Sequence, residues 1–284
     1  MIGLLIGAVL QVAEAQAAAL ERAMAFPNAS TTGVPAGLSL KPSGPLLIDE
    51  AGAMVEGLDI DGGVVIAAPN VTLNNCRVRS GGYQVILVKA PGATISHCDI
   101  DNLGAGGQGI SGAGRFIANN IHGCADGINV SGDNTLIRDN YIHDMKGTAD
   151  SHFDSIQVDG KLSNLRIEHN AVFNEIGQTS ALMLDNYWGP IDHARIERNL
   201  FVGGGYTVYI NEVAKGQPGG GRVTDVVFVD NLLTAGAYGF WDIRTELGDR
   251  PVLSGNRDRV SGRLIPGQSA PEAVRSAKPR PASE

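Results

Sequence analysis

A short motif recurs through the middle of the chain, and its repetition restricts the fold to one type. In each copy an alternating apolar strand leads into Asn or Cys, and a second apolar pair follows. Neighbouring copies are 20 to 32 residues apart. A unit of this length that cannot bury its own apolar face is typical of a solenoid, in which stacked coils share one core. The repeated positions are Cys76, Cys98, Asn120, Asn140, Asn170, Asn199 and Asn231, and a weaker copy contains Asn256.

The repeated Asn and Cys residues have a structural interpretation. An inward Asn at a sharp bend can satisfy the backbone groups of neighbouring coils, so we expect these side chains to support the fold. Cys76 and Cys98 occupy the same position in adjacent coils, and stacked strands lie about 4.8 Å apart. We therefore predict that their sulfurs are neighbours, as packed thiols rather than as a disulfide. Cys124 has no evident partner, and three cysteines make no disulfide framework.

A second strand follows a Gly-rich turn in the same repeats, and period-2 alternation assigns its faces. We expect one inward column to contain Ile110, Ile128, Ile156, Leu182, Val208 and Phe240. One outward column is small and contains Gly109, Gly127, Ser155, Ala181, Thr207 and Gly239. The next outward column contains Ser111, Asn129, Gln157, Met183, Tyr209 and Trp241. A third is polar at its centre, with Asp159, Asp185 and Asn211. The columns predict a groove with a small-residue floor, a carboxylate row and an aromatic end.

Length and composition fit one large domain of this kind. The 284 residues suffice for about eight or nine coils over residues 26–265, with the segment before Gly57 as an N-terminal cap. Residues 1–25 combine a short apolar run with an Ala-x-Ala sequence, which predicts a signal peptide or an N-terminal helix and hence a secreted or periplasmic protein. The Pro-, Ser- and Ala-rich residues 266–284 predict a disordered tail.

Two classes of partner are disfavoured. The net charge of −8 lacks the basic face that nucleic acids require. The apolar run at residues 2–10 is too short to span a membrane. We expect a monomer with no nucleic-acid or membrane partner.

The coils resemble the right-handed parallel β-helix repeats of the pectin-lyase-like superfamily. Residues 26–49 are similar to the opening of secreted bacterial β-helix proteins, and SHFDSIQVDG (151–160) resembles their phrase His-x-Asp-Gly-Ile-Gln, with Ser155 in place of Gly. The resemblance covers roughly residues 26–265 and implies an all-β, single-stranded right-handed parallel β-helix solenoid. It leaves activity open, because the superfamily includes lyases, epimerases, hydrolases and non-catalytic adhesins.

One long coil concentrates ionisable residues. The interval between Asn140 and Asn170 is 30 residues, and its extra length at 143–154 contains His143, Lys146, His152 and Asp154. Insertions in solenoids gather on one face, which is often the binding face. This insertion leads directly into Gln157 and Asp159, so we predict a site there.

Two other features extend this candidate site. Asp159 and Asp185 share a column in adjacent coils, and like charges so close favour either Ca²⁺ with oxygen ligands or carboxyl groups with split pKa values. Sugar rings stack on exposed aromatic faces, which favours a polysaccharide cleft. The residues predicted to bind substrate are His143, Asn129, Gln157, Tyr187, Trp188, Asn211 and Trp241.

We rank a lyase or C5-epimerase acting on a uronic-acid-containing glycan first. In that interpretation Ca²⁺ held by Asp159 and Asp185 neutralises the substrate carboxylate, His152 or Lys146 is the base, and Tyr209 is the acid. The alternatives are a glycoside hydrolase with Asp154 and Asp185 as the carboxyl pair, and a non-catalytic glycan-binding adhesin. Residues 133–215 contain twelve Asp/Glu against seven Lys/Arg. An anionic polysaccharide would therefore be repelled unless a divalent cation screens it, and the other option is a neutral glycan.

Overall fold

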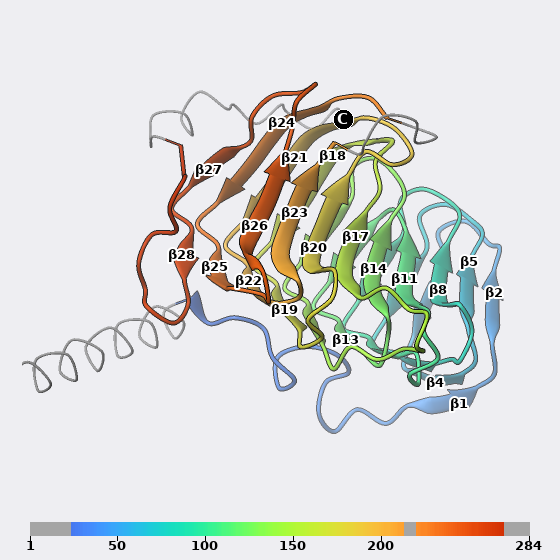
Figure 1. The fold of residues 1–284 in the computed structure, drawn as a ribbon. Helices are drawn as coiled ribbons and strands as arrows, with labels where there is room; N and C mark the ends of the chain where they lie inside the picture. The colour runs from blue at the N-terminus through green and yellow to red at the C-terminus, as the bar shows by residue number, and fades with distance from the viewer. Residues whose placement is uncertain (1–23, 213–219, 270–284) are drawn as a thin grey trace, which may run out of the picture.

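The computed structural model describes residues 24–212 and 220–269, and these form a solenoid of three parallel β-sheets (Figure 1). Sheet A contains ten strands: β1 (Lys41–Ser43), β4 (Leu58–Asp61), β7 (Arg77–Arg79), β10 (Asp99–Asp101), β13 (Asn120–His122), β16 (Tyr141–His143), β19 (Ala171–Asn174), β22 (Leu200–Gly203), β25 (Leu232–Thr234) and β28 (Arg257–Asp258). Sheet B contains nine: β2 (Leu46–Ile48), β5 (Val64–Ile66), β8 (Gln84–Val88), β11 (Gln108–Gly112), β14 (Asp126–Val130), β17 (Asp154–Val158), β20 (Ser180–Asp185), β23 (Tyr206–Asn211) and β26 (Gly239–Arg244). Sheet C contains nine: β3 (Met54–Glu56), β6 (Thr72–Asn74), β9 (Thr94–Ser96), β12 (Arg115–Ile117), β15 (Leu136–Arg138), β18 (Leu162–Glu168), β21 (Ile191–Glu197), β24 (Val223–Val229) and β27 (Val252–Ser254).

Each coil contributes one strand to each sheet, in the order A, B, C. The described residues thus make nine complete coils, and β28 begins a tenth. This confirms the predicted all-β parallel solenoid of eight or nine coils. The sequence motif showed two strands per repeat, whereas the structure has three, because the repeated Asn or Cys lies at the bend between a sheet C strand and a sheet A strand.

The core is built from columns of apolar side chains that the register stacks coil on coil. In sheet A, Ile100 pairs with Val78 on one side and Ile121 on the other, and all three are fully buried. In sheet C the same holds for Ile95 between Leu73 and Phe116. Burial of these columns supplies the hydrophobic stabilisation that no single coil could obtain alone.

The Asn ladder is confirmed as a structural feature, with one member corrected. The buried residue after β12 is Asn119, whose Oδ1 accepts from the Cys98 amide at 3.0 Å; Asn120 belongs to β13 and its side chain is half-buried. From Asn119 onward each Oδ1 accepts from the backbone amide of the preceding coil, at 2.9–3.0 Å. The later members are Asn140, Asn170, Asn199, Asn231 and Asn256.

The N-terminal segment differs from the expected cap. The first coil begins at Lys41, so the residues before Gly57 already form β1, β2 and β3. Figure 1 shows the preceding segment running along the stack past β19 and β13 to β1. Phe26 is buried against Ala171, Leu200 and Leu232, and the Gly33 amide donates to the Ala118 carbonyl at 2.9 Å. We call residues 24–40 the N-terminal strap.

The expectations for the two ends fall partly outside the described residues. This applies to residues 1–23 of the predicted signal peptide or helix, and to residues 270–284 of the predicted tail. Order extends past the predicted boundary at 265, because the Gln268 amide oxygen accepts from the Asn256 backbone amide at 2.8 Å. Within residues 24–212 and 220–269, no helix has the length and apolar character needed to cross a membrane.

Candidate functional site

Along the sheet B strands, the alternation of inward and outward side chains is broken, and this break determines which residues lie on the outer face. Gly109, Gly127, Ser155, Ala181 and Thr207 are all buried. A Cβ atom built on Gly109 would lie 2.7 Å from Ile121 Cγ2 and 3.2 Å from Cys124 Sγ, which are core atoms. The small column therefore faces inward, and the prediction that it forms a groove floor is wrong. Strict alternation failed because two successive positions of each strand face the core.

The residues immediately before that column lie at the starts of the sheet B strands and form a continuous hydrogen-bonded row. Gln108 Nε2 donates to Asp126 Oδ2 at 3.4 Å, the Asp154 amide donates to Asp126 Oδ1 at 3.3 Å, and Ser180 Oγ donates to Asp154 Oδ1 at 2.6 Å. Asp154 is only 3% exposed, whereas Asp126 is half-buried. Two carboxyl groups from adjacent coils thus lie side by side on this face.

Both carboxyl groups hold their protons more tightly than an ordinary Asp. Burial raises the pKa of Asp154 to about 7, and the charges of Asp126 and Asp159 act in the same direction. Burial raises the pKa of Asp126 to about 6, against hydrogen bonds from Asp154 and Gln108 and the positive charge of His152, which lower it. Groups with pKa values near neutrality can both accept and donate protons at physiological pH.

A second row, of two carboxyls and an amide, lies at the end of the same strands. Asp185 is in register with Asn211, and Asp159 follows Val158, which pairs with Leu184. Burial raises the pKa of Asp159 to about 6, and the charge of Asp185 adds to the shift. The Asn211 Oδ1 atom is buried and has no hydrogen-bond partner. Two carboxylates and an unsatisfied amide oxygen are the donors that Ca²⁺ prefers, so these residues fit the expected cation.

Polar and aromatic side chains occupy the column between the two acidic rows. Asn129 Nδ2 donates to Gln157 Oε1 at 2.8 Å, and Tyr209 is in register with Met183. Burial raises the pKa of Tyr209, and the charges of Asp242 and Asp154 act in the same direction. The phenol therefore keeps its proton, and it lies within electrostatic reach of Asp154.

An aromatic loop borders the second acidic row. The Tyr187 amide donates to Asp185 Oδ1 at 2.9 Å, and the Trp188 amide donates to the Asp159 carbonyl at 2.7 Å. The two rings meet edge to face at 4.6 Å, and Trp188 is 56% exposed. The indole is thus presented to solvent beside the acidic row, where a sugar ring could stack on it.

Comparison with known proteins bears on this arrangement. The family model described as the right-handed β-helix region matches residues 56–243. The chain belongs to the right-handed β-helix family. Its β-helix domain fits the pectin-lyase-like superfamily, in which polysaccharide-active enzymes occur. No curated protein and no solved structure matches, so the comparisons assign no specific activity or substrate.

The residues predicted from the insertion at 143–154 do not all lie on the same sheet. His152 is exposed at the start of β17, and its charge acts on Asp126. Lys146 is exposed on the turn before β17, held through its backbone amide to the Cys124 carbonyl at 2.8 Å. His143 lies on sheet A, where it stacks on Tyr141 at 4.0 Å and contacts Asn120 Oδ1 at 2.9 Å. The structure therefore places His143 on a different sheet from Gln157.

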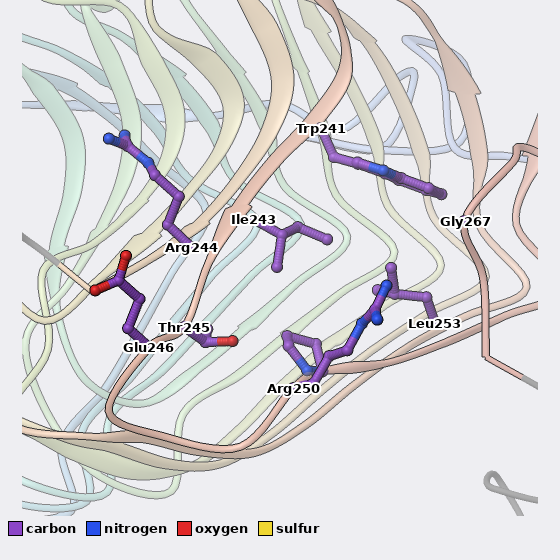
Figure 2. A pocket seen from close by; sticks show the side chains of 9 residues that line it. Trp241, Ile243, Arg244, Thr245, Glu246, Arg250, Leu253 and Gly267 are labelled. Carbon is purple, nitrogen blue, oxygen red and sulfur yellow. The ribbon is translucent and has the colours of Figure 1, made fainter.

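Trp241 is also displaced from the predicted face. It pairs with Val208, an inward position, while Asp242 pairs with Tyr209. The alignment was one residue off because Gly239 stands opposite Tyr206, where Thr207 was expected. Trp241 points into a cavity of about 490 Å³ at the C-terminal end of the β-helix (Figure 2), which Ile243 and Leu253 also line. This end cavity is separate from the outer face of sheet B.

One residue of the candidate site was missed in the interpretation of the sequence. Asp126 was not among the site residues predicted from the sequence. The signal was nevertheless present, because alignment of the repeated motifs puts Asp126 one coil before Asp154. What the sequence lacked was the inward turn of Gly127, which sends the Asp126 side chain outward.

Proposed function

We propose that this β-helix is a polysaccharide-active enzyme, a lyase or C5-epimerase, that removes a proton from a uronic-acid unit bound on the outer face of sheet B. The observation that carries the proposal is the pair of neighbouring carboxyls, Asp126 and Asp154, with pKa values of about 6 and 7, on the same face as the Tyr209 phenol. A secreted or periplasmic location, where such polymers occur, is part of the proposal.

The burial of each group suggests its role. Asp126 is half-buried and mostly deprotonated at pH 7, so it can reach a sugar and act as the base. Asp154 is almost fully buried, so it has little surface with which to contact substrate. Because it lies next to Asp126 in the same row, it can take up the abstracted proton. Tyr209 keeps its proton and, two coils beyond Asp154, can donate a hydrogen bond to the bound glycan. This proposal assigns the base to Asp126 instead of His152 or Lys146. The charge of His152 acts to lower the pKa of Asp126.

Abstraction of a proton next to a carboxylate requires that the carboxylate be neutralised. Ca²⁺, when bound by Asp159, Asp185 and Asn211, would supply that positive charge. The chain's own residues then orient the sugar: Trp188 offers an exposed ring for stacking, and Asn129 and Gln157 offer amide groups for hydroxyls. The same cation would offset the acidic character of the face toward an anionic glycan.

Glycoside hydrolysis is the second candidate, and one observation favours it. Hydrolases need one protonated and one ionised carboxyl group, and Asp154 and Asp126 have pKa values that divide these roles near neutral pH. The pair anticipated from the sequence, Asp154 with Asp185, is less suitable, because Asp154 shares its row with Asp126.

A panel of neutral and uronic polysaccharides distinguishes these activities. The purified full chain is incubated with each polymer, with Ca²⁺ or with a chelator, and ultraviolet absorbance and reducing ends are read together. A lyase gives unsaturated products and reducing ends in equal amounts, and an epimerase gives neither but changes the uronate composition measured by NMR. A hydrolase gives reducing ends without absorbance.

The variant Asp126→Asn tests the site itself. We expect a loss of at least about 100-fold in turnover, the usual contribution of a positioned acid–base group. Asp133→Asn, an exposed carboxyl in the bend before β15, is the matched control and should keep full activity. Full activity of Asp126→Asn, or binding without any chemical change across the panel, would contradict the proposal and favour a glycan-binding adhesin.

A further inference from the structure

Two buried thiols replace the Asn side chains at the start of the ladder. Cys76 follows β6 and Cys98 follows β9, which are the positions that Asn119 occupies after β12. Each thiol donates to the carbonyl two residues before it, at 3.2 Å for Cys76 and 3.3 Å for Cys98. Cys98 Sγ also reaches back toward the Leu73 carbonyl at 3.7 Å, as Asn119 Nδ2 reaches back to Ile95. The second and third coils thus have thiols where later coils have amides.

The register brings the two thiols together. The flanking residues pair directly, Asn74 with Ser96 and Arg77 with Asp99. Residues in register on neighbouring strands lie about 4.8 Å apart, within the Cα separation of about 4.4–6.8 Å that a disulfide requires. The neighbouring Cys98 side chain lowers the pKa of Cys76 to about 7, while burial raises the pKa of Cys98.

We propose that Cys76 and Cys98 form a disulfide when the chain folds in an oxidising compartment, and that this bond is a covalent link between the second and third coils. Both thiols are free in the described structure, so the link is an oxidised state of the same geometry. The thiols make only long hydrogen bonds to the preceding coil, whereas a disulfide would join the two coils covalently. The link lies one coil from the end of the stack, where β1, β2 and β3 pair with no further strand of the described residues.

The chemistry is thiol–disulfide exchange with a small disulfide such as oxidised glutathione. The Cys76 thiolate attacks one sulfur of that disulfide and releases one glutathione thiolate. Cys98 then loses its proton and attacks Cys76 Sγ, which forms the new bond and releases the second glutathione thiolate. The two protons go to the released thiolates. Because both cysteines are fully buried in the folded chain, the exchange takes place before coils two and three close.

The test is refolding of the full chain from denaturant in a buffer of oxidised and reduced glutathione, followed by alkylation under denaturing, non-reducing conditions. We expect alkylation of Cys124 alone, a mass about 2 Da below that of the reduced protein carrying one alkyl group, and a peptide linking Cys76 to Cys98. Reduction should lower the melting temperature by roughly 5 °C, since the bond closes a loop of moderate length.

Cys124→Ser is the matched control, because Cys124 is equally buried but its thiol donates to the His122 carbonyl at 3.1 Å and has no cysteine neighbour. That variant should still form the bond, and Cys98→Ser should not. Alkylation of all three cysteines after oxidative refolding, or a Cys124 linkage, would overturn the proposal. This result is independent of the polysaccharide assays, so either proposal can fail alone.

Discussion

At the scale of single residues, the carboxyl of Asp154 costs the fold stability at neutral pH. It is almost fully buried and accepts one short hydrogen bond from Ser180 Oγ, which does not replace the water that an ionised carboxylate would have. Its neighbours Asp126 and Asp159 add negative charge. Residues retained under such a cost are typical of sites where proton transfer is needed.

Asp154→Asn should separate stability from activity. The folded-state pKa of Asp154, about 7, is above the ordinary value of 3.8. Folding therefore binds a proton between these values, and the associated stability is present below about pH 4 and lost as the pH rises through 7. The variant removes that loss, so at pH 8 we expect it to be more stable than the wild type by roughly 2–4 kcal/mol, with little difference at pH 4.

Chemical denaturation of both proteins at pH 4 and pH 8 measures this effect, and the activity of the variant should fall. Equal stability differences at the two pH values would show that Asp154 is ionised in the folded state.

The Asn ladder gives a second prediction at residue scale. Asn119→Ala removes the acceptor for the Cys98 amide and the donor to the Ile95 carbonyl, both in the core, and should cost roughly 1–3 kcal/mol. Asn120→Ala removes one acceptor for His143 on the half-buried outer side of sheet A and should cost less than about 1 kcal/mol. Urea unfolding compares the two. A larger effect at Asn120 would contradict the ladder as described.

The sequence could not choose between these two residues. Adjacent Asn residues both fit the motif, and only the position of the bend decides which one turns inward. The other ladder members have no Asn neighbour, and for them the motif was sufficient.

At the scale of elements, register determined which predictions held. The inward Ile and Leu columns of sheet B were predictable, because their apolar character repeats in every coil. The outward columns were predictable only from Asn129 to Tyr209, where each coil keeps the same strand start. In β26 the strand begins one residue later than the motif suggested, and Trp241 therefore turned into the end cavity. A one-residue shift reverses the face of every side chain in a strand.

The N-terminal strap is an element that the repeats did not predict, because it belongs to no coil. Its anchor is Phe26, which is buried with Leu200 and Leu232 and stacks on His169 at 5.7 Å. His169 in turn contacts the Met24 carbonyl and Asp139 Oδ1, both at 2.7 Å. The strap thus combines apolar and polar contacts with the outer side of sheet A.

Phe26→Ala should release the strap without unfolding the solenoid. Loss of a buried Phe side chain typically costs about 3–5 kcal/mol of stability. We expect this cost to exceed the free energy with which the other strap contacts hold the strap on the coils. Limited proteolysis should then cut within residues 24–40 much faster than in the wild type. Leu38→Ala, at a position 43% exposed, is the control and should leave the cutting rate unchanged. Global unfolding of Phe26→Ala would show that the strap and coils fold as one unit.

At the scale of the whole molecule, the fold was predictable because each of the nine coils buries its apolar side chains against its neighbours in the same way. The site was only partly predictable. The neighbouring carboxyls of the acidic rows come from residues 26 to 28 positions apart that the stack brings together, and the sequence indicated most of them. The face that each one occupies depended on the bend before each strand, which the apolar pattern does not encode.

The molecule's charge gives a further prediction. With a net charge of −8 and two acidic rows on one face, binding of a polyuronate should strengthen at least about tenfold when Ca²⁺ is added. Asp185→Asn should weaken that dependence, while binding of a neutral glycan should not change with the metal. Isothermal titration with and without a chelator measures both. Polyuronate binding that is equally strong without the metal would contradict the cation role.

The most direct test of the account is a crystal structure of the Asp126→Asn variant soaked with an oligosaccharide from a polymer that the wild-type protein modifies. We predict an oligosaccharide along the outer face of sheet B, with one sugar in contact with residue 126, another near Tyr209, and a ring against Trp188. A sugar bound on sheet A near His143, or in the end cavity beside Trp241, would contradict the proposed site.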